Sequence, residues 1–189
     1  MEEKTKLGMG VAGEVARGAG LKAAIGLKTH YEIECRAPDG TLKWREEFDN
    51  LVVNAGLNDN LDRYFKGSSY TAAWYVGLTA ATPTPAAGDT LASHAGWVEF
   101  VQYDEATREA LTLGTVSSQS VDNSASKAVF TIATNGSVIG GAFVTDESSY
   151  TESPQTGVLY GVGAFSGGNK SADDGDTISV TVTLTAAAA

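Results

Sequence analysis

Apolar and polar residues alternate over much of the chain, which is the pattern of β-strands buried on one side. The alternation is clearest at 177–185, where Ile178, Val180, Val182 and Leu184 are separated by threonine and serine. Because side chains two positions apart share one side of a strand, these four residues predict an apolar sheet face. The strands predicted after residue 70 are 73–78, 97–103, 127–133, 137–144, 157–165 and 177–185.

Two earlier segments, 31–36 and 42–48, are predicted to pair as a β-hairpin. Between them, Pro38 fixes φ at the value that a turn needs, and Gly40 can adopt a positive φ. Cys35 is the single cysteine of the chain and lies in the alternating pattern. We therefore interpret it as a small buried apolar residue rather than a nucleophile.

One helix is predicted, at 54–66, with Asn54 as its N-cap and Gly67 as its stop signal. Its apolar residues recur at helical spacing and are expected to bury one stripe of the helix surface. They are Leu57, Leu61, Tyr64 and Phe65.

Residues 1–27 differ in composition, because glycine repeatedly interrupts the alanine, valine and leucine residues. A glycine inside a helix costs about 1 kcal/mol relative to alanine, so this segment should become ordered only against a partner or against the main domain. We predict an extended glycine-rich N-terminal arm at 1–27 and a single β-rich domain at 28–189. The expected fold class is mainly β, with a β-sandwich or jelly-roll-like domain that carries one short helix at about 54–66.

Two segments are predicted to contact partners. The arm is expected to dock on a neighbouring subunit, through residues that include Gly8, Gly10, Gly13 and Lys22. The loop 79–96, which carries Pro83 and Pro85, is long for a connection inside a compact domain. Long ordered loops are often contact surfaces.

The charge of −10 is unevenly distributed. Residues 1–66 hold ten of the thirteen basic residues and eleven of the twenty-three acidic ones, so the rest of the chain carries about −9. Such a surface repels phosphate, so nucleic acid is not expected as a partner. No run of about 18 apolar residues occurs and the first residues do not resemble a signal peptide, so we expect synthesis in the cytoplasm and no membrane contact.

The sequence contains little that catalysis requires. The segment 8–13 matches a dinucleotide-binding glycine pattern, but no strand precedes it. His30 and His94 are far apart and have no second histidine or cysteine at the spacing of metal ligands. There is no Gly-x-Ser-x-Gly motif. We therefore predict no catalytic residue, no cofactor and no enzymatic activity.

Two features have both a functional and a structural interpretation. Asp173, Asp174 and Asp176 are a weak candidate for a cation site, because only part of a coordination shell is visible, and a tight turn before the last strand is the favoured interpretation. The three tryptophans could form a sugar-binding platform, but their inward positions on predicted strands favour core packing. They are Trp44, Trp74 and Trp97.

From residue 31 onward the chain resembles structural proteins of tailed-bacteriophage particles. The resemblance consists of a charged hairpin, an Asn-Leu-Val segment and a helix that begins with Gly-Leu, followed by further matching segments. The segments that carry it are 34–40, 42–44, 50–57, 70–78, the loop with Pro83 and Pro85, 92–97, 120–124 and 140–143.

The resemblance implies a non-enzymatic virion protein located in the phage particle. We expect a capsid decoration, or cement, protein on the outside of the head that bridges capsomers, with the major capsid protein or another virion protein as its partner. A homo-oligomer, either a dimer or a trimer, is the natural unit for such a role. The alternative is a tail, neck, baseplate or fibre-anchoring component, and a carbohydrate-binding virion domain is a further alternative.

Overall fold

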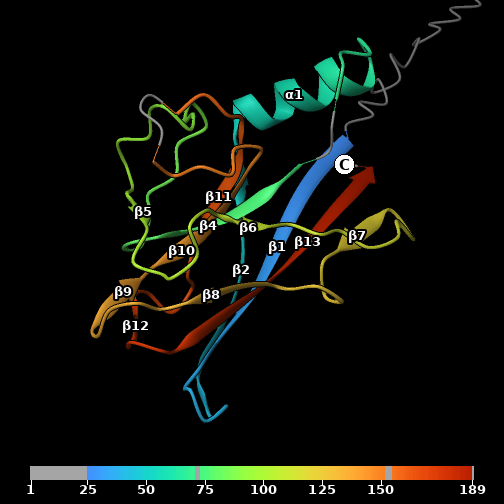
Figure 1. The fold of residues 1–189 in the computed structure, drawn as a ribbon. Helices are drawn as coiled ribbons and strands as arrows, with labels where there is room; N and C mark the ends of the chain where they lie inside the picture. The colour runs from blue at the N-terminus through green and yellow to red at the C-terminus, as the bar shows by residue number, and fades with distance from the viewer. Residues whose placement is uncertain (1–24, 71–72, 152–154, 189) are drawn as a thin grey trace, which may run out of the picture.

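The computed structural model describes residues 25–70, 73–151 and 155–188, which form a mainly β fold of antiparallel sheets with one helix (Figure 1). Its elements are β1 (Ile25–Arg36), β2 (Leu42–Asp49), β3 (Leu51–Val52), α1 (Asn54–Tyr64), β4 (Tyr75–Thr79), β5 (Glu99–Phe100), β6 (Glu109–Ala110), β7 (Ser120–Asp122), β8 (Ala128–Thr131), β9 (Ser137–Ile139), β10 (Gly141–Thr145), β11 (Leu159–Ala164), β12 (Lys170–Ala172) and β13 (Thr177–Ala188). The predicted mainly β, sandwich-like fold class is confirmed.

The first sheet has the order β2-β1-β13-β7, and β8 also pairs with β13. Its centre is a long ribbon in which β1 and β13 pair from Ile25 with Ala188 to Arg36 with Thr177. The predicted hairpin of β1 and β2 is confirmed, and Gly40 in its turn has a φ of 86°. Residues 25–27, which were predicted to belong to the arm, are therefore the first residues of β1.

The second sheet has the order β3-β11-β10-β4-β5, with β6 paired to β4. The segment predicted as one strand at 137–144 is two strands, because the chain changes sheet at Gly140. A Cβ on Gly140 would lie 1.9 Å from the backbone nitrogen of Thr82, so only glycine fits where the two segments touch. β9 then pairs with β12 in a small sheet, and β10 lies in the second sheet.

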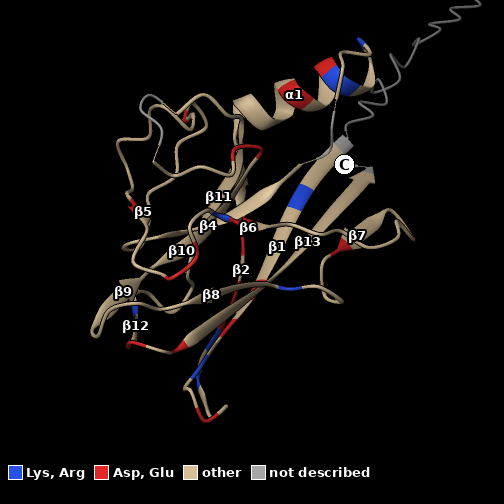
Figure 2. Cartoon of the chain, in the orientation of Figure 1, with Lys and Arg blue, Asp and Glu red and all other residues tan. Residues whose placement is uncertain are grey.

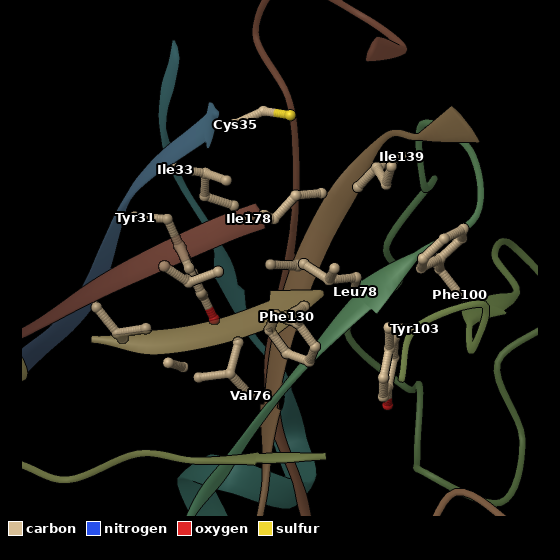
Figure 3. Packing of buried hydrophobic residues seen from close by; sticks show 14 of the residues in the cluster. Tyr31, Ile33, Cys35, Val76, Leu78, Phe100, Tyr103, Phe130, Ile139 and Ile178 are labelled. Atoms are coloured by element: carbon tan, nitrogen blue, oxygen red, sulfur yellow. The ribbon is translucent and has the colours of Figure 1, made fainter. Parts of the chain in front are cut away.

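The two large sheets pack face to face around the main hydrophobic core (Figure 3). The first sheet contributes the alternating residues of β1, β8 and β13, and the second contributes those of β4 and β10. The core residues from these strands are Tyr31, Ile33, Cys35, Val76, Leu78, Ala128, Phe130, Ala142, Val144, Ile178, Val180 and Val182. The predicted burial of Cys35 and of the alternating face of the last strand is thus confirmed as far as Val182.

The loop between β4 and β5 covers the opposite face of the second sheet. There Phe143, on the other side of β10, packs in a second cluster with Leu91 and Trp97 from the loop region. Pro83 is buried, and a Cβ on Gly141 would lie 3.0 Å from its ring. Of the two prolines predicted to contact a partner, Pro83 is buried over the sheet and so offers little surface for such a contact, whereas Pro85 is half-buried.

Candidate interaction surface

Helix α1 has its apolar side exposed, which is the reverse of the prediction. We call Leu57, Leu61, Tyr64 and Phe65 the apolar stripe; their exposed fractions are 41%, 58%, 83% and 71%. The residues turned toward the sheets are polar or small instead, and among them Ala55 packs against the second cluster. Leu184 of β13 shares the space beside α1 with Asn60 and Arg63, whereas most of the apolar stripe faces away from the domain.

The position of α1 is set by one glycine. Gly56 is the buried residue of the helix and lies against the backbone of Tyr160 in β11. The helix begins without a side-chain cap, so the prediction of Asn54 as N-cap is wrong; its backbone N–H donates instead to the carbonyl of Ala87. Gly67 follows the helix with a φ of 70°, as predicted for the stop signal.

A groove lies between α1 and the ends of the sheets, beside the start of β1. The part under the C-terminal half of α1 has a volume of about 340 Å³ and is lined by aromatic rings and by the polar side of the helix. Trp74 meets Tyr160 edge to face at 5.5 Å, and the guanidinium of Arg63 lies 4.7 Å from the centre of the Tyr70 ring.

Ion pairs fix the polar side of α1 beside this groove. Arg63 donates to Asp59 at 2.8 Å, one turn earlier in the helix, and lies 3.5 Å from Asp146 in the segment after β10. Figure 2 shows both acidic and basic residues on α1. The helix is therefore attached to the domain by polar contacts and by the small residues Ala55 and Gly56, which leaves the apolar stripe uncovered.

The groove continues along the ribbon of β1 and β13. This second part, of about 320 Å³, is lined by Leu27, Val116, Leu184 and Ala186, and Asn60 of α1 lies at the boundary of both parts. Val116 is 69% exposed. The apolar stripe and the groove are therefore neighbouring apolar surfaces, and contiguous exposed apolar surface often marks an interaction site in soluble proteins.

The tryptophans pack as the structural interpretation predicted. Trp97 is buried in the second cluster, and Trp44 and Trp74 are half-buried against the main core. His94 stacks on Trp97 with 3.7 Å between ring centres, and His30 bonds to Asp49 at 2.9 Å. Neither histidine approaches a cluster of metal ligands in the described part of the chain.

The acidic turn before β13 forms ion pairs with a lysine of the hairpin. The ammonium of Lys43 lies 2.9 Å from Asp173 and 2.5 Å from Asp176, while Asp176 also accepts from the backbone N–H of Asp173. Asp174 has no part in this ion pair; its N–H donates to Asn135. The positive charge beside Asp173 and Asp176 is thus the ammonium of Lys43. Among the described residues, no group of three or more His, Cys, Asp or Glu side chains could hold a metal ion.

Replacing Lys43 with methionine is expected to destabilise the protein most near neutral pH. The ammonium of Lys43 lowers the pKa of Asp173. This carboxylate therefore contributes stability above its unfolded pKa of about 4, and the contribution disappears as pH falls through the lower folded value. In urea unfolding from pH 2 to 8, the difference between Lys43→Met and the native protein should close below about pH 4. A difference in the free energy of unfolding that stays constant at all pH values would contradict this account. The matched control is Lys66→Met, which removes the lysine of an exposed ion pair with Asp62.

Cys35 shows no sign of nucleophilic character. It is fully buried between the sheets, and its thiol lies 3.9 Å from a carboxylate oxygen of Asp176. Burial, with the nearby negative charge of Asp176, raises the pKa of the Cys35 thiol to about 12. The thiol therefore stays protonated at neutral pH, which is the inert state.

One buried charged pair was not foreseen from the sequence. Arg108 is 1% exposed and donates two 2.7 Å hydrogen bonds to the carboxylate of Glu99. Its remaining N–H groups donate to the backbone carbonyls of Glu147 and Ser149 and to Gln155. Arg108 thereby joins β5 to the connection between β10 and β11, and since its donors are used within the protein, we assign it a structural role.

The predicted contact residues of the arm, Gly8, Gly10, Gly13 and Lys22, lie outside the described residues. Within the described part, no helix combines the length and the apolar character that crossing a membrane requires. Comparisons of the chain with protein-family models, curated proteins and solved structures found no match. The residues and the fold are therefore the basis for any functional proposal.

Proposed function

We propose that this chain is a non-enzymatic structural protein of a tailed-bacteriophage particle, which decorates the outside of the capsid and bridges capsomers. The observation that carries the proposal is the apolar stripe of α1, a contact surface that a rigid β domain leaves uncovered. The charged side chains of Arg108, Glu99 and Asp176 form ion pairs within the fold. This structural use of buried charges supports the non-enzymatic part of the proposal. The resemblance of residues 31 onward to virion proteins supports the location.

A decoration role has a simple energetic basis. A single small contact binds weakly, but several linked copies that engage a regular lattice together bind tightly, because each attached copy raises the effective concentration of the others. A homo-oligomer on the capsid would gain from this effect, and its partner would be the major capsid protein or another virion protein.

The test is the position of the protein on intact particles, by gold-labelled antibodies or by image reconstruction. Density at regular positions over the head is the expected result. Density confined to the tail, neck or baseplate would overturn decoration in favour of a tail component. Absence from purified particles would overturn the virion assignment altogether.

A further inference from the structure

The apolar stripe and the adjoining groove need an occupant. Two copies of α1 packed on each other would bury few side chains, since the helix has 11 residues and most of the stripe lies on two turns. Such a helix pair would also leave the adjoining groove uncovered. An occupant that also fills the groove beside Leu27 and Ala186 is required.

The chain itself supplies such a segment. Residues 1–24 lead into Ile25 at the end of the long ribbon, and Leu27 and Lys28, a few residues further on, line the groove. At about 3.4 Å per residue, the 14 residues from 11 to 25 can span roughly 48 Å. Helix α1 is only about 16 Å long at 1.5 Å per residue, so the reach of the segment exceeds what the stripe requires.

The sequence of this segment suits an apolar contact. Leu7, Met9 and Val11 alternate with Gly8 and Gly10. In an extended conformation the three apolar side chains would share one side, and the glycines would let the backbone approach a neighbouring surface closely.

The direction of β1 favours a second copy over the same chain. Between Leu27 and Ile25 the chain runs along the ribbon toward its end at Ala188, and the groove lies back beside Leu27 and Leu184. An arm that covered its own groove would have to reverse direction directly before Ile25. An arm that continues outward reaches a neighbouring molecule.

We propose that residues 7–11 of one copy pack against the apolar stripe and groove of a second copy. If the exchange is reciprocal, each copy gives one arm and receives one, so that two such contacts add up in a closed dimer. This inference rests on the proposed function in taking a homo-oligomer as the working unit. Its test uses the full-length protein in solution, so failure of the arm contact and failure of the virion assignment are distinguishable.

The experiment places a spin label on Ala12→Cys, next to the proposed contact segment. Cys35 is fully buried, so the introduced thiol is the reactive one. Spin-labelled chains without ¹⁵N are unfolded together with unlabelled ¹⁵N chains and refolded as a mixture. Loss of amide signal intensity at 57–65 in the ¹⁵N chains is expected, because only the arm of another copy can cause it.

Two variants of the ¹⁵N chain make the result specific. Leu61→Glu should abolish the signal loss and convert the oligomer to a monomer in light scattering. Asn58→Glu, which also introduces a charge at an exposed position of α1, should do neither. A second sample carries the spin label and ¹⁵N on the same chains. Signal loss in that sample alone, and not in the mixture, would show that each arm covers its own groove, and would overturn the proposal. Absence of signal loss in either sample would also overturn it.

Discussion

Replacing Arg108 with methionine is expected to lower the free energy of unfolding by about 3–5 kcal/mol. The reason is that Glu99, its partner in a buried ion pair, would be left without a counter-charge. Glu99 would lose both of its 2.7 Å hydrogen bonds, and the carbonyls of Glu147 and Ser149 would lose their donor. In a domain of this size, such a loss lowers Tm by roughly 10 °C. Thermal and urea unfolding followed by circular dichroism would measure it.

The matched control is Arg45→Met. Arg45 forms ion pairs with Glu32 and Glu47 at 2.9 and 2.7 Å, but its side chain is 46% exposed. Exposed pairs contribute about 1 kcal/mol or less. Equal destabilisation by Arg45→Met and Arg108→Met would show that burial is not what makes the Arg108 pair important.

Two further measurements separate loss of the ion pair from loss of packing. Burial raises the pKa of Glu99 even beside Arg108. Without Arg108 the folded state should bind a proton at Glu99 more readily than the unfolded state, so the destabilisation should be smaller at pH 5 than at pH 8. The double variant Arg108→Met with Glu99→Leu should recover part of the stability, because no buried charge is left unpaired.

How well the sequence predicts the fold of this protein depends on how far apart in the sequence the interacting residues lie. Long strands such as β13 follow from local alternation, since Ile178, Val180 and Val182 must share a side. Residues 25–27 were assigned to the arm because Gly26 weakens the local pattern, yet the register with β13 extends the strand to Ile25. A pairing partner at the other end of the chain leaves no local signal.

The same distinction applies to the acidic turn. Its aspartates were recognised, but the lysine that neutralises them is far away in sequence. β1 pairs with both β2 and β13, so that Cys35 lies opposite Trp44 on one side and Ile178 on the other. This register brings Lys43 next to Asp176, and only the strand order reveals it.

Helix α1 shows why a correct element can carry a wrong site prediction. The spacing of Leu57 and Leu61 defines an apolar stripe, and the helix is present as predicted. Periodicity specifies which residues share a side, but it does not specify whether that side faces the same chain. Here the opposite side makes the intramolecular contacts, through Asp59, Asn60 and Arg63 beside Tyr160.

Replacing Gly56 with alanine tests that orientation, and it is expected to destabilise the protein by about 1–3 kcal/mol through overpacking. The sign is unusual, because glycine to alanine inside a helix ordinarily stabilises it by about 1 kcal/mol. A Cβ at Gly56 would lie 2.4 Å from the carbonyl oxygen of Tyr160 and 2.9 Å from its Cα. These are backbone atoms, and the carbonyl oxygen of Tyr160 already accepts a hydrogen bond from the N–H of Val53, so no side-chain rotation can relieve the clash.

Asn58→Ala is the control for this prediction, because Asn58 is exposed on the same helix and its replacement acts through helix propensity alone. It should stabilise the protein by a few tenths of a kcal/mol. Opposite signs for the two variants in urea unfolding would show that the side of α1 with Gly56 faces the sheet. Stabilisation by both would mean that α1 is not packed on β11 through Gly56, and the apolar stripe would then no longer be fixed as the outward side of the helix.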